Sequence, residues 1–138
     1  MKILVAHRQK QIVAAIRSVL SSVNPVVIHT ESGLDGLLTS RIEHFDVIIC
    51  GTDLPVVTGF EMVRSLRTNS VNRETAVVFL TNGEVNDKVL RHANALKALA
   101  IINEESVVAD LALLIIDRVV SKPDQDWASL STPVRSLY

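Results

Sequence analysis

Five short apolar runs alternate with five helical patterns along the chain. Each run is unbroken rather than alternating with polar residues, which is typical of strands buried on both faces of a sheet. The runs predict strands over residues 2–6, 25–30, 47–50, 76–80 and 99–102. Apolar residues that recur every three or four positions predict helices over residues 9–22, 32–44, 58–69, 84–97 and 106–121.

The regular alternation of strands and helices predicts βαβ units and a parallel sheet covered by helices on both faces. Right-handed crossovers limit the topology, and the flavodoxin-like strand order 2-1-3-4-5 is the simplest arrangement for five such units. We therefore expect an α/β, three-layer (βα)5 sandwich over residues 1–121. Residues 122–138 are polar and contain two prolines, so we expect a flexible C-terminal tail.

Composition excludes several classes of function. Apolar residues make up 48% of the 138 residues, and the formal net charge of −1 gives no basic field for general nucleic-acid binding. No apolar stretch is long enough to span a bilayer, and the N-terminal run is too short for a signal peptide. We therefore expect a cytoplasmic protein without nucleic-acid or membrane partners. The single cysteine, Cys50, lies inside an apolar run and is expected to be a small buried hydrophobe.

The segment from Asp46 to Gly59 carries the clearest functional signal. An apolar run ends at Gly51, a short loop with Pro55 follows, and a helical pattern begins at Thr58, a good N-cap. The segment resembles the end of the third strand in the receiver domains of bacterial response regulators, the CheY-like family. In that family the residue after the apolar run is the aspartate that accepts a phosphoryl group. Gly51 has no side chain, so the resemblance implies a receiver that lacks its phosphoacceptor.

Other positions depart from the same family in a consistent way. Family receivers place two acidic residues after the first strand, which hold Mg²⁺ together with the acceptor aspartate. The matching positions here are His7 and Arg8. Replacing three carboxylates by His, Arg and Gly turns about three negative charges into about one positive charge. The resemblance therefore implies that no metal and no cofactor binds in this crevice.

The family's switch positions are altered as well. Thr81 matches the Ser or Thr whose hydroxyl contacts the phosphoryl group, and this residue type is kept. Asn103 stands at the position of the family's lysine and cannot form an ion pair with a phosphoryl group. Ala100 falls at the aromatic switch position and has no bulky side chain to move between buried and exposed states.

Arg8 and its neighbours suggest how the crevice is closed. Arg8 could pair with Glu104 or Glu105, which follow the fifth predicted strand, or it could bind an anion. The salt bridge is the simpler interpretation and would act as a built-in locked state. His29, near the end of the second predicted strand, is a further candidate for the crevice mouth.

These features favour a pseudo-receiver of the two-component type that is not an enzyme and signals through protein contacts without phosphorylation. Its partner would be a sensor kinase, an output protein or an adaptor protein. One alternative is a phosphorylation-competent receiver that uses Asp53, although we expect that residue to cap a turn before Pro55. Another is a flavodoxin-like small-molecule binder, which the sequence HRQK over residues 7–10 disfavours because it is not a glycine-rich phosphate loop.

The last predicted helix is apolar nearly all round, whereas a helix on one face of a sheet needs an apolar stripe of roughly 100°. Leu113, Ile116 and Val120 are therefore expected to be partly exposed unless a partner covers them. Family receivers commonly pair through the face of the fourth helix, fifth strand and fifth helix, so we expect a homodimer or a protein partner there. The alternative is that Trp127 or Leu130 of the tail folds back over this helix.

Overall fold

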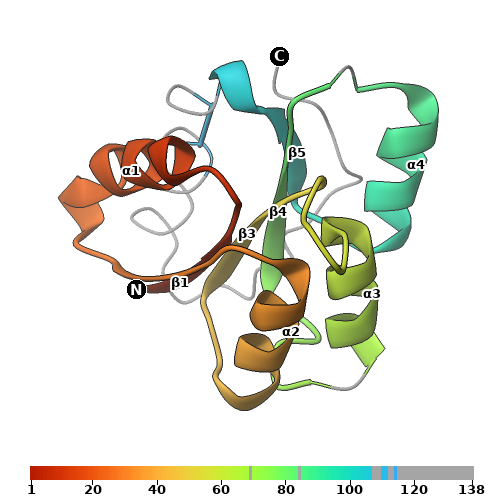
Figure 1. Ribbon diagram of the computed structural model, residues 1–138, viewed down its shortest axis with the longest axis horizontal. Coiled ribbons are helices and arrows are strands. Elements are labelled where there is room, and N and C mark those ends of the chain that lie inside the picture. The colour runs from red at the N-terminus through yellow and green to blue at the C-terminus, as the bar shows by residue number, and fades with distance from the viewer. Residues whose placement is uncertain (69, 84, 107–109, 112–113, 115–138) are drawn as a thin grey trace.

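Five parallel strands form one sheet in the order β2-β1-β3-β4-β5 (Figure 1). The computed structural model describes residues 1–68, 70–83, 85–106, 110, 111 and 114. The strands are β1 (Lys2–Ala6), β2 (Val26–Thr30), β3 (Val47–Gly51), β4 (Ala76–Thr81) and β5 (Ala100–Asn103). The helices in the described part are α1 (Lys10–Val19), α2 (Gly33–Ile42), α3 (Gly59–Thr68) and α4 (Asp87–Ala95), with 3₁₀ turns η1 (Ser21–Val23) and η2 (Glu104–Ser106). The predicted parallel sheet and its strand order are confirmed.

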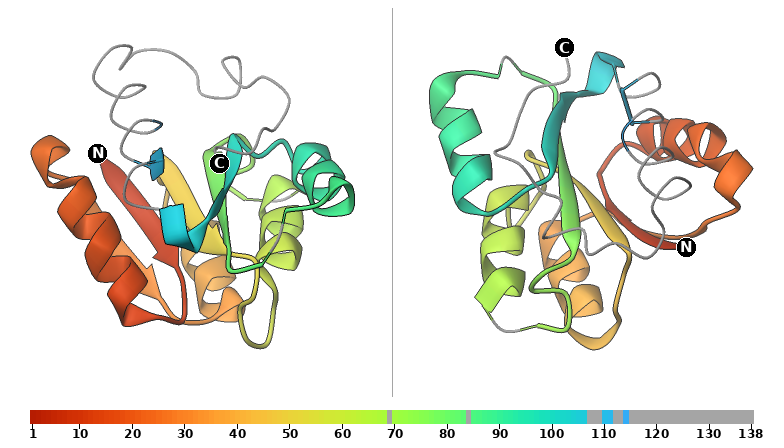
Figure 2. Two further views of the ribbon diagram at one scale, coloured as in Figure 1. Left: turned by 90° about the horizontal axis from the view of Figure 1, so that it is seen from above. Right: turned by 180° about the vertical axis from the view of Figure 1, so that it is seen from behind.

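The sheet separates two apolar cores. Helix α1 lies against one face, and α2, α3 and α4 lie against the other (Figure 1 and Figure 2). Alternate residues of each strand enter opposite cores, so that Val5 joins the cluster that contains Ile16 of α1, while Leu4 joins the cluster that contains Met62 of α3. Every residue of β3 and β4 is buried, as the unbroken apolar runs predict for central parallel strands.

The helices begin and end within a few residues of their predicted bounds. Thr58 and Glu61 form a capping box at the start of α3: Thr58 Oγ1 accepts the Glu61 N–H at 3.2 Å, and Glu61 Oε1 accepts the Thr58 N–H at 3.3 Å. The prediction that Thr58 is an N-cap is confirmed. Nearly all of the helix predicted over residues 106–121 lies outside the described residues, although Leu111 and Leu114 belong to the core on the α1 side.

Helix α2 turns its small residues and Leu37 toward the protein and its other large apolar residues toward solvent. Gly33, Gly36 and Ser40 are buried. Leu34, Leu38 and Ile42, which supply most of the helical apolar pattern in the sequence, are exposed. The helix approaches its neighbours closely, because a Cβ added at Gly36 would lie 2.8 Å from Met62 Sδ. The spacing therefore predicted the helix, but its core-facing side is set by the small residues.

Two polar side chains hold the amino edge of the sheet together. Asn72 is fully buried, and its side chain makes four hydrogen bonds. Nδ2 donates to the Ser40 and Glu43 carbonyls at 2.6 and 2.7 Å, and Oδ1 accepts from the Phe45 N–H and the Thr75 hydroxyl at 2.8 and 3.0 Å.

The guanidinium of Arg67, at the end of α3, donates to four carbonyls. Its acceptors are Leu96, Arg73, Thr75 and Lys97, at 2.9, 3.1, 2.6 and 3.3 Å. These bonds fix the loops that lead into β3, β4 and β5.

Cys50 is fully buried in β3, which confirms its predicted role as a small apolar core residue. Burial raises the pKa of the Cys50 thiol far above its ordinary value, so the thiol stays protonated in the folded protein. A search of the described residues finds no helix with the length and apolar character needed to cross a membrane.

Candidate functional site

The carboxyl ends of the strands bring the residues singled out in the sequence to one edge of the sheet. Residue His7 directly follows β1, Gly51 ends β3, Thr81 ends β4 and Asn103 ends β5. The strand register aligns these ends: Ala6 pairs with Cys50, Gly51 with Leu80, and Thr81 with Asn103. In an open parallel sheet this edge is where ligands bind. The predicted crevice is therefore assembled from β1, β3, β4 and β5.

The imidazole of His7 lies directly over Gly51. A Cβ placed on Gly51 would be 3.1 Å from His7 Cδ2 and 3.5 Å from His7 Nε2. The His7 residue is only 3% exposed. A side chain at position 51 would enter space that the ring already occupies. Gly51 and His7 are thus complementary in shape, and the ring fills the volume into which an acceptor side chain would project.

Hydrogen bonds fix the position and the tautomer of His7. The Gln9 N–H donates to His7 Nδ1 at 3.0 Å, so Nδ1 carries a lone pair and Nε2 carries the proton. That Nε2–H donates to Glu104 Oε1 at 2.7 Å, and the His29 ring donates through Nε2 to the His7 carbonyl at 2.8 Å. Both ring nitrogens of His7 are therefore engaged, and His29 belongs to the crevice mouth as expected.

The ion pairing of Arg8 differs from the expectation. Arg8 Nη2 lies 2.9 Å from Asp53 Oδ2, so it pairs with the β3–α3 loop rather than with Glu104 or Glu105. The acidic residues after β5 have other contacts: Glu104 meets His7, and the Glu105 N–H donates to Asn103 Oδ1 at 2.9 Å. His7 and Arg8 are adjacent in sequence, but their side chains leave the end of β1 in different directions. His7 rather than Arg8 therefore contacts Glu104, and Arg8 contacts Asp53.

The contact made by the Asp53 side chain also differs from the expected one. It was expected to cap a turn before Pro55, but its carboxylate contacts Arg8 of the β1–α1 loop. Both side chains of this pair are more than half exposed, so the contact is screened by water and contributes little to stability. The His7–Glu104 hydrogen bond and the Arg8–Asp53 ion pair nevertheless span the crevice from the end of β1 to the loops after β5 and β3.

The residues at the crevice do not fit the Mg²⁺ ion that receivers of the family hold. Magnesium prefers oxygen ligands, especially carboxylates. Arg8 is cationic, Gly51 offers no side-chain donor, and both nitrogens of His7 are already used. No cluster of three or more His, Cys, Asp or Glu side chains with metal-binding geometry occurs in the part of the chain that the structure describes. The residues that stand at the positions of the family's Mg²⁺ ligands therefore offer that ion no free oxygen ligand.

The switch-equivalent residues make local contacts. Thr81 is buried, and its Oγ1 accepts the Gly83 N–H at 3.2 Å, which closes a tight turn after β4. Asn103 Nδ2 donates to the Gly83 carbonyl at 3.4 Å, so the loops after β4 and β5 are joined. Ala100 is completely buried in β5. The interface candidates Leu113, Ile116 and Val120 lie outside the described residues.

The loop after β3 brings the first residue of α3 close to the end of β3. A Cβ on Gly59 would lie 2.1 Å from the Gly51 carbonyl oxygen, so only glycine fits at the first residue of α3. Val56 has a φ of 69°, a left-handed conformation that is strained for a β-branched residue. The Val57 N–H donates to the Pro55 carbonyl across Val56 at 2.8 Å, which stabilises this tight bend.

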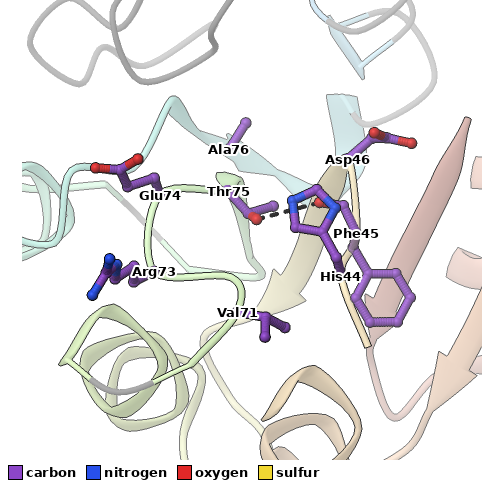
Figure 3. Close-up of a pocket in the computed structure, with 8 residues that line it drawn as sticks. All are labelled: His44, Phe45, Asp46, Val71, Arg73, Glu74, Thr75 and Ala76. Carbon is purple, nitrogen blue, oxygen red and sulfur yellow. Dashed lines mark hydrogen bonds between the residues drawn. The ribbon is translucent and has the colours of Figure 1, made fainter. Parts of the chain in front are cut away.

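A hollow of about 350 Å³ lies at the opposite, amino edge of the sheet. Its lining residues precede β3 and β4 or begin β4 (Figure 3): His44, Phe45, Asp46, Val71, Arg73, Glu74, Thr75 and Ala76. The Thr75 hydroxyl shares its single proton between Asn72 Oδ1, at 3.0 Å, and the Phe45 carbonyl, at 3.2 Å, the contact dashed in Figure 3. The buried Thr75 hydroxyl of this hollow thus joins the loop that leads into β4 to the loop that leads into β3.

Sequence reasoning missed the partnership of His7 with Glu104. The signal was an acidic residue directly after the fifth strand, opposite a histidine directly after the first. Because both strands end at the same edge, the topology allows a contact between His7 and Glu104. The expectation from the sequence instead pairs Glu104 with the neighbouring Arg8.

The family model described as the response regulator receiver domain matches residues 3–112. The chain is similar in structure to the chemotaxis response regulator CheY4 of Vibrio cholerae, with 26% identity, a TM-score of 0.68, and 80% of this chain and 94% of that chain covered. It is also similar to a CheY-like receiver domain protein from Methanospirillum hungatei JF-1, with 16% identity, a TM-score of 0.76, and 88% and 95% covered.

A third similar structure is that of a receiver domain from a sensor histidine kinase. The receiver domain of the sensor histidine kinase PA1611 from Pseudomonas aeruginosa PAO1 has 20% identity and a TM-score of 0.59, with 66% of this chain and 77% of that chain covered. That structure has a magnesium ion coordinated in its active-site cleft. The search of curated proteins gives no match to this sequence.

Proposed function

We propose that this chain, which belongs to the response regulator receiver domain family, is a pseudo-receiver that signals through protein contacts and accepts no phosphoryl group. The observation that carries the proposal is the imidazole of His7 lying over Gly51, in the volume that an acceptor side chain would need. The proposal also holds that the protein is not an enzyme and needs no metal.

The charges around the crevice support this proposal. Phosphoryl transfer in receivers depends on a carboxylate acceptor and on a cation that neutralises the phosphoryl oxygens. Here the polar side chains already have partners within the protein: the His7 ring donates to the Glu104 carboxylate, and Arg8 forms an ion pair with Asp53. These contacts join the loops after β1, β3 and β5. Such a crevice favours one conformation of this edge without a covalent signal.

The proposed output is binding to another protein of a two-component pathway. The state of the pathway would then depend on the amount of this chain and on its association with the partner, which is a sensor kinase, an output protein or an adaptor. The fully buried Ala100 supports the same reading, because a methyl group cannot transmit a signal by rotating between the core and the surface.

Intact-mass spectrometry after incubation with acetyl phosphate and Mg²⁺ tests the proposal. We expect no added phosphoryl group on the wild-type chain, because Gly51 offers no nucleophile and Asp53 is paired with Arg8. The Asp53→Asn variant is the matched control and is expected to behave like the wild type. Labelling of the wild type that disappears in Asp53→Asn would instead identify a phosphorylation-competent receiver that uses Asp53.

A further inference from the structure

The loop between β4 and α4 contains the single place in the sequence where an asparagine is followed by a glycine, Asn82 and Gly83. Both residues are exposed and lie outside any helix or strand, directly after Thr81 at the carboxyl edge of the sheet. In such a pair the backbone nitrogen of the glycine can reach the side-chain amide of the asparagine, because no Cβ obstructs the approach and the glycine backbone is permissive. The pair is therefore a place where a side-chain amide can react.

The side-chain amide of Asn82 is held less firmly than those of other asparagines. Asn72 is fully buried, and its amide is bonded at both ends. Asn86 caps α4 and Asn103 caps the turn after β5, each by accepting a backbone N–H through Oδ1 at 2.9 Å. The Asn82 side chain makes no hydrogen bond to another residue of the described part of the chain. Its amide can therefore turn toward the next peptide unit without breaking such a contact.

The backbone of Gly83, by contrast, is restrained from both sides. Its N–H donates to Thr81 Oγ1 at 3.2 Å, and its carbonyl accepts from Asn103 Nδ2 at 3.4 Å. Both distances lie at or beyond the long end of the usual range, so these hydrogen bonds are weak. The Gly83 nitrogen can attack only after its N–H leaves Thr81 Oγ1. The Thr81 hydroxyl therefore limits how often the reactive arrangement forms.

We infer that Asn82 is a site of spontaneous deamidation and that the Thr81 hydroxyl slows the reaction. The Gly83 nitrogen loses its proton to solvent and forms a bond with Asn82 Cγ. The bond from Cγ to the side-chain nitrogen breaks, and that nitrogen takes up a proton and leaves as ammonia. Water then opens the resulting succinimide ring at either carbonyl. The products are aspartate and isoaspartate, with one water consumed, one ammonia released and no change of oxidation state.

Both products alter the carboxyl edge of the sheet. A neutral amide becomes a carboxylate, so the formal net charge falls by one, from −1 to −2. In isoaspartate the backbone also runs through the former side chain, which inserts one extra carbon before Gly83. The contacts of Gly83 with Thr81 Oγ1 and Asn103 Nδ2 cannot both survive this insertion, and the loops after β4 and β5 then lose their connection.

This inference goes beyond the proposed function and does not depend on it. Closure of the crevice to phosphoryl transfer rests on His7 lying over Gly51. Deamidation of Asn82 needs only water, and it places a negative charge at the same edge without a kinase. A chain that accepts a phosphoryl group and still deamidates at Asn82 would overturn only the proposed function.

Tandem mass spectrometry tests the site on the full chain, kept in neutral buffer for several weeks and digested at acidic pH, where the reaction is slow. We expect residue 82 to convert to a mixture of aspartate and isoaspartate while Asn72, Asn86 and Asn103 remain amides. Gly83→Ala should slow the conversion about tenfold, because the new Cβ crowds the attacking nitrogen. Among the described residues, that Cβ would meet only Thr81 Oγ1, at 3.9 Å, and the φ of Gly83 is not positive, so this variant keeps the fold.

Thr81→Val gives an arm that tests the role of the hydroxyl. Valine is similar in shape to threonine but cannot accept the Gly83 N–H, so conversion of Asn82 should be about fivefold faster than in the wild type. Residue 82 remaining an amide in the wild type would overturn the inference, as would a Gly83→Ala chain that converts as fast as the wild type. A Thr81→Val chain that converts no faster than the wild type would overturn the role given to Thr81.

Discussion

Replacing Gly51 by aspartate is expected to destabilise the protein by about 3 kcal/mol and to leave it without phosphoryl acceptance. The new Cβ would stand 3.1 Å from His7 Cδ2, so the imidazole must move. That movement breaks the bonds of His7 to Glu104 and to the Gln9 N–H, at 2.7 and 3.0 Å, and leaves polar groups unpaired in a buried place. Urea unfolding followed by circular dichroism measures the loss.

Gly83→Asp is the matched control for this substitution. Among the described residues, a Cβ on Gly83 would meet only Thr81 Oγ1, at 3.9 Å, so the same chemical change has room there and should cost less than about 0.5 kcal/mol. Adding His7→Ala to Gly51→Asp should recover at least half of the lost stability, because the ring is the obstacle. A Gly51→Asp variant as stable as the wild type would show that His7 does not close the crevice.

Replacing Arg67 by methionine is expected to lower the free energy of unfolding by about 3 kcal/mol. Burial lowers the pKa of the Arg67 guanidinium, which means that the charged form is disfavoured by its surroundings and depends on its hydrogen bonds. The guanidinium remains protonated at neutral pH, so its contribution should not change between pH 6 and 8, roughly. Methionine retains apolar packing but leaves the carbonyls of Leu96, Arg73, Thr75 and Lys97 without this donor.

Arg64→Met is the control on the same helix, one turn earlier. Arg64 is exposed and lies 3.3 Å from the His92 ring through Nη2, a contact open to water. We expect a loss below about 0.5 kcal/mol. Equal losses in the two variants would mean that the four carbonyl contacts of Arg67 do not hold the amino edge together.

The fold could be predicted because its strands have a simple physical signature. Strands such as β3 and β4 are buried on both faces and read as unbroken apolar runs, and helices between such strands require a parallel sheet. The positions of Gly51, Thr81 and Asn103 at one edge follow from that topology alone. The family resemblance then predicted which receiver side chains those positions do not carry.

The contacts within the crevice could not be predicted in the same way. His7 and Arg8 are neighbours in sequence, and no periodicity shows which of them turns toward η2 and which toward the β3–α3 loop. The choice depends on the Gln9 N–H, which holds the His7 ring by its Nδ1. Glu104 is then taken by His7, and Arg8 pairs with Asp53 instead.

The orientation of α2 was hidden for a different reason. An apolar pattern with helical spacing normally marks the buried face of a helix. Here Gly36 must face Met62 and Ala6 at contact distance, and this steric requirement outweighs the burial of Leu34, Leu38 and Ile42. Arg67 gave no signal, since one arginine near the end of a helix looks like any exposed basic residue.

The central claim is that the crevice of this receiver is closed to phosphoryl chemistry. Calorimetric titration of the full chain with beryllofluoride, a mimic of the phosphoryl group, in the presence of Mg²⁺ tests it most directly. A receiver with an intact acidic crevice serves as the positive control. We predict no saturable heat from this chain, because His7 fills the space over Gly51 and the donor set does not fit the metal. Saturable binding at one site per chain would contradict the account.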